Sequence, residues 1–77
     1  MAERKKPVEE SVFIIGQNIA KIIKEKNLIL REVAVDSGMD PENLRKYIKG
    51  KQTMGINIVV RISKALDVQI SEIFEGV

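Results

Sequence analysis

The chain has 77 residues, of which 13 are Lys or Arg and 11 are Asp or Glu, and it contains neither His nor Cys. This length suits one small domain, and the missing His and Cys remove the common nucleophile–base pairs, transition-metal ligands and disulfides, so we expect no enzyme, no metal and no cofactor. No apolar run approaches the ~20 residues that cross a bilayer and no signal peptide is present, so we expect a cytoplasmic protein.

Residues 1–9 are predicted to form a flexible N-terminal tail that precedes a folded domain over residues 10–77. The tail is basic through Arg4, Lys5 and Lys6. Two interpretations remain open for it. It is either a disordered chain end or an arm that contacts phosphates or a minor groove.

A first helix is predicted to begin near residues 8–11 and to run to about residue 26. Apolar side chains recur there at helical spacing, which predicts one buried stripe. The stripe consists of Val12, Ile15, Ile19 and Ile22. Asn27 is predicted to end the helix, because Asn tolerates a left-handed backbone.

The segment LREVAVDSGMDPENLRKYIK, residues 30–49, predicts two short helices joined by a tight turn. Ala34 in the first helix lets the second approach closely, and Gly38 can adopt the positive φ that such a turn requires. Asp40 is predicted to cap the second helix, and Pro41 suits its first turn. We therefore expect helices at about residues 30–36 and 41–49, the second with two inward-facing side chains, Leu44 and Tyr47.

Two further helices are predicted in the C-terminal third of the chain. The first spans about residues 56–66, with Ile56, Val59, Ile62 and Leu66 as its core positions. A short last helix is expected near residues 71–74, with Ser71 as its cap and with Ile73 and Phe74 packing inward. Because no strand-like alternation competes with these periods, the fold class is predicted to be all-α.

Basic charge is concentrated in one stretch of the chain. Between Asn43 and Met54 there are four basic residues and no acidic one, whereas the segment after Lys64 carries only acids, at Asp67, Glu72 and Glu75. A rigid helix with a cationic outer face, held by a helix and a tight turn, matches the arrangement that docks in the DNA major groove. The acidic C-terminal segment is poorly suited to face phosphates.

From about residue 15 to residue 74 the chain resembles the Cro/repressor-type helix-turn-helix family, often called XRE-like. The resemblance rests on the segments IGQNIAKIIKEKNL, REVAVDSGM, LRKYIKGK, RISKAL and VQISEIF. It implies a compact five-helix, phage-repressor-like domain that binds operator DNA, commonly as a homodimer. The chain departs from the family where the second helix begins, because Ile29 and Leu30 replace the family's capping hydroxyl residue and its DNA-contacting Gln.

The candidate DNA contacts lie mainly on the helix at residues 41–49. Arg45, Lys46 and Lys49 can pair with guanine edges or with phosphates. Asn43 can bond an adenine in bidentate fashion, and Glu42 either accepts from a cytosine amine or partners the helix dipole.

Contacts with the phosphate backbone, which would position the protein on DNA, are expected from two further places, the first helix and the loop after the third helix. The candidates there are Gln17, Asn18, Lys51, Gln52 and Thr53. The complete predicted set of DNA-binding residues is Gln17, Arg31, Pro41, Glu42, Asn43, Arg45, Lys46, Lys49, Lys51, Gln52 and Thr53.

The sequence therefore predicts a sequence-specific regulator of transcription, expected to be a repressor, that binds double-stranded DNA. Two alternatives stay open: a protein-interaction module or antitoxin-like partner of the same fold, and a nonspecific DNA binder. A homodimer is expected to form through the helix at residues 56–66 and Ile70, Ile73 and Val77, because one reading helix contacts few base pairs. Aliphatic residues where a monomer prefers polar ones also suggest a partner surface, namely Ile14, Ile23, Leu30, Val35 and Ile58.

Overall fold

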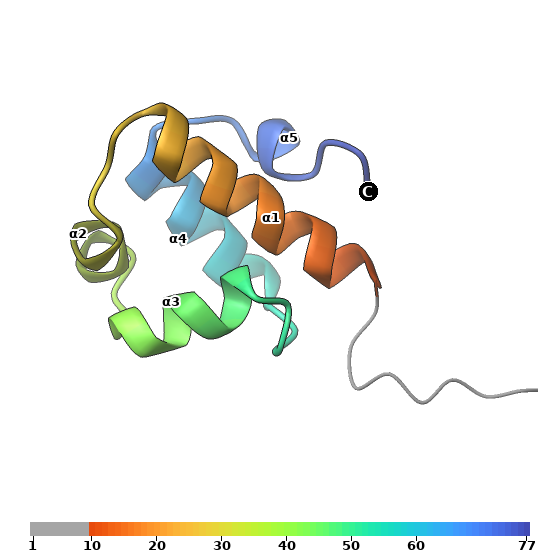
Figure 1. Cartoon of the computed structure of the whole chain (residues 1–77), viewed down its shortest axis with the longest axis horizontal. Coiled ribbons are helices and arrows are strands. Elements are labelled where there is room, and N and C mark those ends of the chain that lie inside the picture. Colours follow the sequence, from red (N-terminus) through yellow and green to blue (C-terminus); the bar gives the residue numbers. More distant parts are fainter. Residues whose placement is uncertain (1–9) are drawn as a thin grey trace, which may run out of the picture.

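The computed structural model describes residues 10–77, which contain five helices and no strand (Figure 1). The helices are α1 (Glu10–Glu25), α2 (Leu30–Asp36), α3 (Pro41–Ile48), α4 (Ile56–Leu66) and α5 (Ile70–Ile73). The predicted all-α class and the predicted order of the helices are confirmed. The basic tail and any helical residue before Glu10 lie outside the described residues. None of the helices within residues 10–77 has the length and apolar composition that crossing a bilayer requires.

The core is formed by all five helices, each of which contributes at least one buried aliphatic side chain. Among its most completely buried members are Ile19, Leu44, Ile62, Leu66 and Ile73. Helix α1 contacts α3 and α5, α2 contacts α3 and α4, and α5 also contacts α4. The helix-turn-helix pair, α2 and α3, is therefore supported from both sides, by α1 and by α4.

Residues with a left-handed backbone conformation end the helices at the positions where the sequence predicts a stop. Asn27 after α1 has φ 61°, Gly38 after α2 has φ 75° and Gly50 after α3 has φ 71°. Asp67 ends α4 in the same conformation, with φ 59°. The Nζ of Lys26 donates hydrogen bonds to the carbonyl oxygens of Leu66 (2.9 Å) and Asp67 (3.1 Å), which ties the end of α1 to the end of α4.

Helices α1 and α3 approach each other at Gly16, which is buried. A Cβ atom built at Gly16 would clash with the carbonyl oxygen of Tyr47 and would lie 2.5 Å from that of Ile48. Both obstacles are backbone atoms, so neither can move without moving α3. The absence of a side chain at residue 16 thus determines how closely the two helices pack.

Several predictions about individual apolar residues are wrong. Ile56 and Phe74 were expected in the core but are 67% and 37% exposed, because both line an open apolar hollow instead. Ile23, expected at the surface, is buried against the core. The cap of α5 is Gln69 rather than Ser71, and the backbone N–H of Gln69 donates to the Glu72 carboxylate at 3.2 Å.

Gly38→Ala is expected to lower the free energy of unfolding by about 1 kcal/mol, the typical cost of placing a Cβ in the left-handed region. The space at residue 38 is sufficient, since the nearest described atom outside the adjacent residues, the Arg61 Nη1 atom, would lie 3.7 Å from a Cβ there. Urea unfolding of Gly38→Ala and of Gly38→Asn measures the effect. Asn tolerates positive φ, so it should lose clearly less. Equal losses in the two variants would contradict a conformational origin.

Candidate nucleic-acid interface

The turn between α2 and α3 is held by hydrogen bonds that fix the direction of α3. Ser37 is 1% exposed, and its hydroxyl donates to the carbonyl oxygen of Val33 at 2.8 Å. The backbone N–H of Met39 donates to the carbonyl oxygen of Ala34 at 3.0 Å. Because Ala34 is fully buried beneath the turn, α3 leaves the turn in one defined direction.

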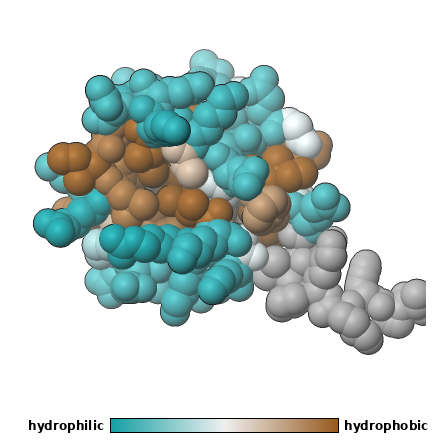
Figure 2. All heavy atoms as spheres, in the orientation of Figure 1, coloured by the Kyte–Doolittle hydropathy of each residue, from teal (hydrophilic) through white to brown (hydrophobic). Residues whose placement is uncertain are grey.

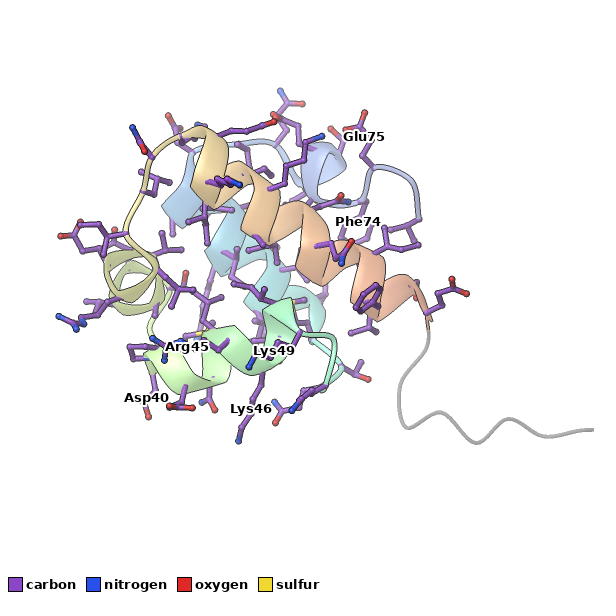
Figure 3. The ribbon with its side chains drawn as sticks, in the orientation of Figure 1. Asp40, Arg45, Lys46, Lys49, Phe74 and Glu75 are labelled. Carbon is purple, nitrogen blue, oxygen red and sulfur yellow. The ribbon has the colours of Figure 1, made fainter. Side chains whose placement is uncertain are left out.

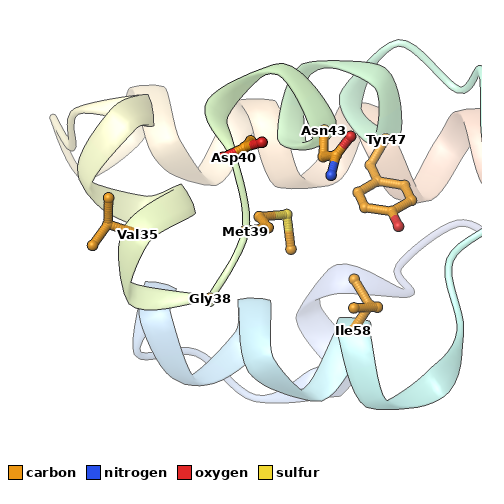
Figure 4. A pocket seen from close by; sticks show the side chains of 7 residues that line it. All are labelled: Val35, Gly38, Met39, Asp40, Asn43, Tyr47 and Ile58. Carbon is orange, nitrogen blue, oxygen red and sulfur yellow. The ribbon is translucent and has the colours of Figure 1, made fainter.

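The start of α3 differs in one respect from its prediction. Asp40 occupies the capping position with an extended backbone (φ −74°, ψ 147°), and Pro41 follows at the start of the helix. However, the Asp40 side chain makes no capping hydrogen bond. Asp40 instead borders an open hollow beside α3 (Figure 4).

The side chains of α3 divide into a buried and an exposed set. Leu44 is completely buried, and Tyr47 and Ile48 are half-buried. The outer face of α3 consists of its exposed residues Glu42, Asn43, Arg45 and Lys46, together with Lys49 directly after the helix. In Figure 3 Lys46 points away from the body of the protein. In Figure 2 the edge formed by α3 is hydrophilic, whereas apolar side chains gather across the middle of the same view.

One ion pair lies on the outer face. The Nη1 atom of Arg45 is 3.7 Å from the Oε2 atom of Glu42, one helical turn earlier, and the two side chains are 52% and 80% exposed. Within residues 10–77 the structure contains no other ion pair. An exposed pair of this kind contributes only about 0–1 kcal/mol to stability, so Arg45 is easily released to another anion.

A hollow of about 580 Å³ lies between α3 and the start of α4. Its lining residues are Val35, Gly38, Met39, Asp40, Asn43, Tyr47 and Ile58. Figure 4 shows the Tyr47 ring extending from α3 toward Ile58 of α4, with its hydroxyl at the open space. Tyr47 thus combines the predicted packing role with a hydroxyl at the open hollow.

The structure brings most of the predicted DNA-binding residues together around α3. Gln17 is exposed on α1 directly after Gly16, where α1 meets the backbone of α3. Lys51, Gln52 and Thr53 continue from the end of α3 into the loop before α4. Arg31 lies apart from this group. It lines a shallow hollow on α2 together with Glu32, Val35 and Asp36.

Asn18 has a structural role that the sequence did not predict. Its Nδ2 atom donates to the carbonyl oxygens of Ile73 (2.8 Å) and Glu75 (2.7 Å), residues 55 and 57 positions away. Both amide hydrogens are therefore used inside the protein. A phosphate contact from the Asn18 amide, as predicted, would require these hydrogen bonds to break.

Arg61 is a cation that the sequence analysis missed. It is exposed on α4, and its Nη1 atom would lie only 3.7 Å from a Cβ at Gly38, so its guanidinium covers the turn between α2 and α3. No local pattern in α4 indicates this position, since it depends on how α4 crosses α2.

Glu75, the last acidic residue of the chain, lies on the other side of the molecule from the outer face. Figure 3 shows Phe74 and Glu75 opposite Arg45, Lys46 and Lys49. The cations of the outer face therefore face away from the Glu75 carboxylate. This separation leaves a local positive surface on a chain whose formal net charge is only +2.

Comparisons with known proteins agree with this geometry. A model of the Cro/C1-type HTH DNA-binding domain matches residues 18–77. The fold is similar to that of the restriction-modification controller protein C.AhdI from Aeromonas hydrophila, with a TM-score of 0.81 and 21% identity over 86% of this chain and 100% of that one. It is also similar to the clp gene regulator ClgR from Corynebacterium glutamicum, with a TM-score of 0.81 and 19% identity over 87% of this chain and 71% of that one. No curated protein sequence matches the chain.

Proposed function

The chain belongs to the Cro/C1-type family of helix-turn-helix DNA-binding domains, and we propose on this basis that it regulates transcription by placing α3 in the major groove of double-stranded DNA. The observation that carries the proposal is the outer face of α3. Arg45, Lys46 and Lys49 are exposed there, opposite the fully buried Leu44. A helix held by its inner face and cationic on its outer face has the form that major-groove docking requires. Repression needs only occupancy of a promoter, so we propose a repressor.

The proposed contacts divide by chemistry. Arg45 and Lys46 project from the outer face and are suited to guanine edges, and Asn43 is suited to adenine. Lys49, Lys51, Gln52, Thr53 and Gln17 flank the helix and are proposed to bind phosphates, which would set its register on the duplex. Pro41 is proposed to approach the bases through its ring at the start of the helix.

The start of α2 affects which residues can anchor the domain to the phosphate backbone of DNA. Ile29 occupies the capping position and makes no side-chain capping bond, and Leu30 is half-buried against the core. Neither side chain can donate a hydrogen bond to a phosphate. The proposed anchoring therefore depends on α3 and on the loop after it.

Selection of bound duplexes from a random-sequence DNA pool tests the proposal. Enrichment of a defined sequence supports a specific regulator. Binding with a steep salt dependence and no preferred sequence would instead indicate a nonspecific binder. No binding at low salt would favour the protein-interaction alternative, for which Ile29 and Val35, 58% and 66% exposed on the α2 side, offer apolar surface.

We further propose that two copies bind together through the C-terminal side of the domain. An apolar hollow of about 180 Å³ lies where Phe74 meets the first half of α1 and the start of α4, and it is lined by Val12, Ile15, Met54, Ile56, Val59 and Phe74. Ile70 and Val77 are also exposed, at 36% and 57%, whereas Ile73 is completely buried and cannot contribute as the sequence predicted. Phe74 lies opposite the outer face of α3 in Figure 3, so pairing there leaves both reading helices free.

Phe74→Glu is expected to convert a dimer into a monomer, because it places a carboxylate on the apolar hollow. Sedimentation at micromolar concentration, with and without DNA, measures the change. Val35→Glu is the matched control, since it makes the same kind of change at an exposed apolar residue on α2. A native chain that is monomeric alone and on DNA, bound at one asymmetric half-site, would rule out the dimer while leaving DNA binding intact.

A further inference from the structure

Glu42 is the one acidic residue on the outer face of α3, and it lies in the first turn of that helix. Glu72 shows what a carboxylate in a first helical turn can do, because it accepts a hydrogen bond from the backbone N–H that caps α5. Among the described residues Glu42 has no such bond. Its side chain is 80% exposed, and its partner is the guanidinium of Arg45.

We infer that Glu42 and Arg45 act as a pair that selects cytosine and guanine at neighbouring base pairs, an inference that rests on the proposed function. The pair carries no net charge, so it contributes little to attraction by the phosphate backbone. In the major groove both members have partners: the guanidinium donates to O6 and N7 of guanine, and the carboxylate accepts from the N4 amine of cytosine. Adenine suits the carboxylate less well, because its N7 acceptor lies beside its amine.

The spacing of the two residues fits adjacent base pairs. Residues three apart on a helix are about 4.5 Å apart along its axis, and successive base pairs are about 3.4 Å apart along the duplex. Because the ion pair is exposed and 3.7 Å long, the guanidinium can leave Glu42 for a base without breaking a buried contact. The ion pair thus holds both groups on the same side of α3 until the bases replace it.

Glu42 also disfavours wrong sites. On a sequence without a suitably placed cytosine, its carboxylate meets an acceptor or a phosphate and is repelled. Lys46 and Lys49 would bind such a sequence through phosphates alone. A single acid among cations therefore lowers affinity for random DNA and raises the ratio of specific to nonspecific binding.

The test compares the native chain with Glu42→Gln and with Glu75→Gln as the matched control. Gln keeps the length of the side chain and removes its charge, and Glu75 lies on the opposite side of the molecule (Figure 3). Each protein selects duplexes from a random-sequence pool, and each is then titrated with the native chain's selected duplex and with a copy in which one C·G pair is replaced by T·A. Circular dichroism confirms that the variants are folded.

The native chain and Glu75→Gln are expected to recover an invariant cytosine next to a guanine and to lose about ten-fold in affinity on the replaced duplex, the discrimination of one good base contact. Glu42→Gln should lose that preference and bind random duplexes more tightly than the native chain. If Glu42→Gln selects the same sequence with the same discrimination, the inference is overturned while the proposed function stands. If the native chain enriches no sequence, the proposed function and the inference both fail.

Discussion

Gly16→Ala is expected to lower the free energy of unfolding by about 3 kcal/mol, near the upper end of what overpacking costs. The added methyl group would meet the backbone carbonyl oxygens of Tyr47 and Ile48, the latter at 2.5 Å. Since a carbonyl group in a helix cannot rotate away as a side chain can, α1 and α3 must separate. Separation opens the core next to Ile19 and Leu44, both completely buried.

Gly55→Ala provides the control for Gly16→Ala. A Cβ at Gly55 would meet only the Asn57 Oδ1 atom, at 3.1 Å, and the end of that side chain can move. Urea unfolding of both variants, followed by circular dichroism, gives the two losses. The loss at Gly55 should stay below about 1 kcal/mol, as for most exposed positions. Comparable losses at both glycines would show that the approach of α1 to α3 does not depend on residue 16.

Lys46→Ala and Arg45→Ala are each expected to weaken DNA binding by about 1–3 kcal/mol without unfolding the domain. Both side chains are exposed, and neither contributes to the core beneath Leu44. Removing a base contact should relax the preference at one position. Removing a phosphate contact should weaken all sequences alike and reduce the salt slope by about one. Titration of duplex DNA at several salt concentrations separates these outcomes.

Lys64→Ala is the matched control for the two variants. Lys64 is also an exposed cation, but it lies in the last turn of α4, away from α3. Its removal changes the net charge by the same amount and should alter affinity only slightly. If Lys46→Ala and Arg45→Ala bind DNA as the native chain does, or if Lys64→Ala loses as much, the docking of α3 proposed above is wrong.

Local signals were sufficient to predict the helices. The predicted bounds of α2 and α4 agree with the structure, because Gly, Asn and Pro mark stops and starts and because apolar residues recur at helical spacing. The same periodicity could not determine which side chains are covered. Ile56 continues the stripe of α4, yet its side chain is 67% exposed at an open apolar hollow. Ile23 lies beside the stripe of α1, and whether it is buried depends on the width of the contact with the rest of the core.

For the candidate interface, the residues of α3 were predictable because turn chemistry and charge both lie within twenty consecutive residues. The features of the interface that the sequence did not indicate depend on contacts with residues far away in the chain. Asn18 is a polar residue of the type expected at a surface contact. However, its amide donates hydrogen bonds to Ile73 and Glu75, which are remote in sequence. Arg61 reaches the turn only because α4 crosses there. Contacts between residues so far apart in the sequence produce no recurring spacing from which they could be predicted.

The hydrogen bonds from Asn18 also govern how the C-terminal end opens. A helix of four residues such as α5 would normally fray, since it has too few internal hydrogen bonds to persist alone. Here the carbonyl oxygens of Ile73 and Glu75 are held by α1, and the Ile73 side chain is completely buried. Opening this end therefore exposes part of the core and releases α1 at the same time. We therefore expect opening of the C-terminal end to cost more free energy than the fraying of an unsupported four-residue helix, which slowed amide hydrogen exchange in α5 would show.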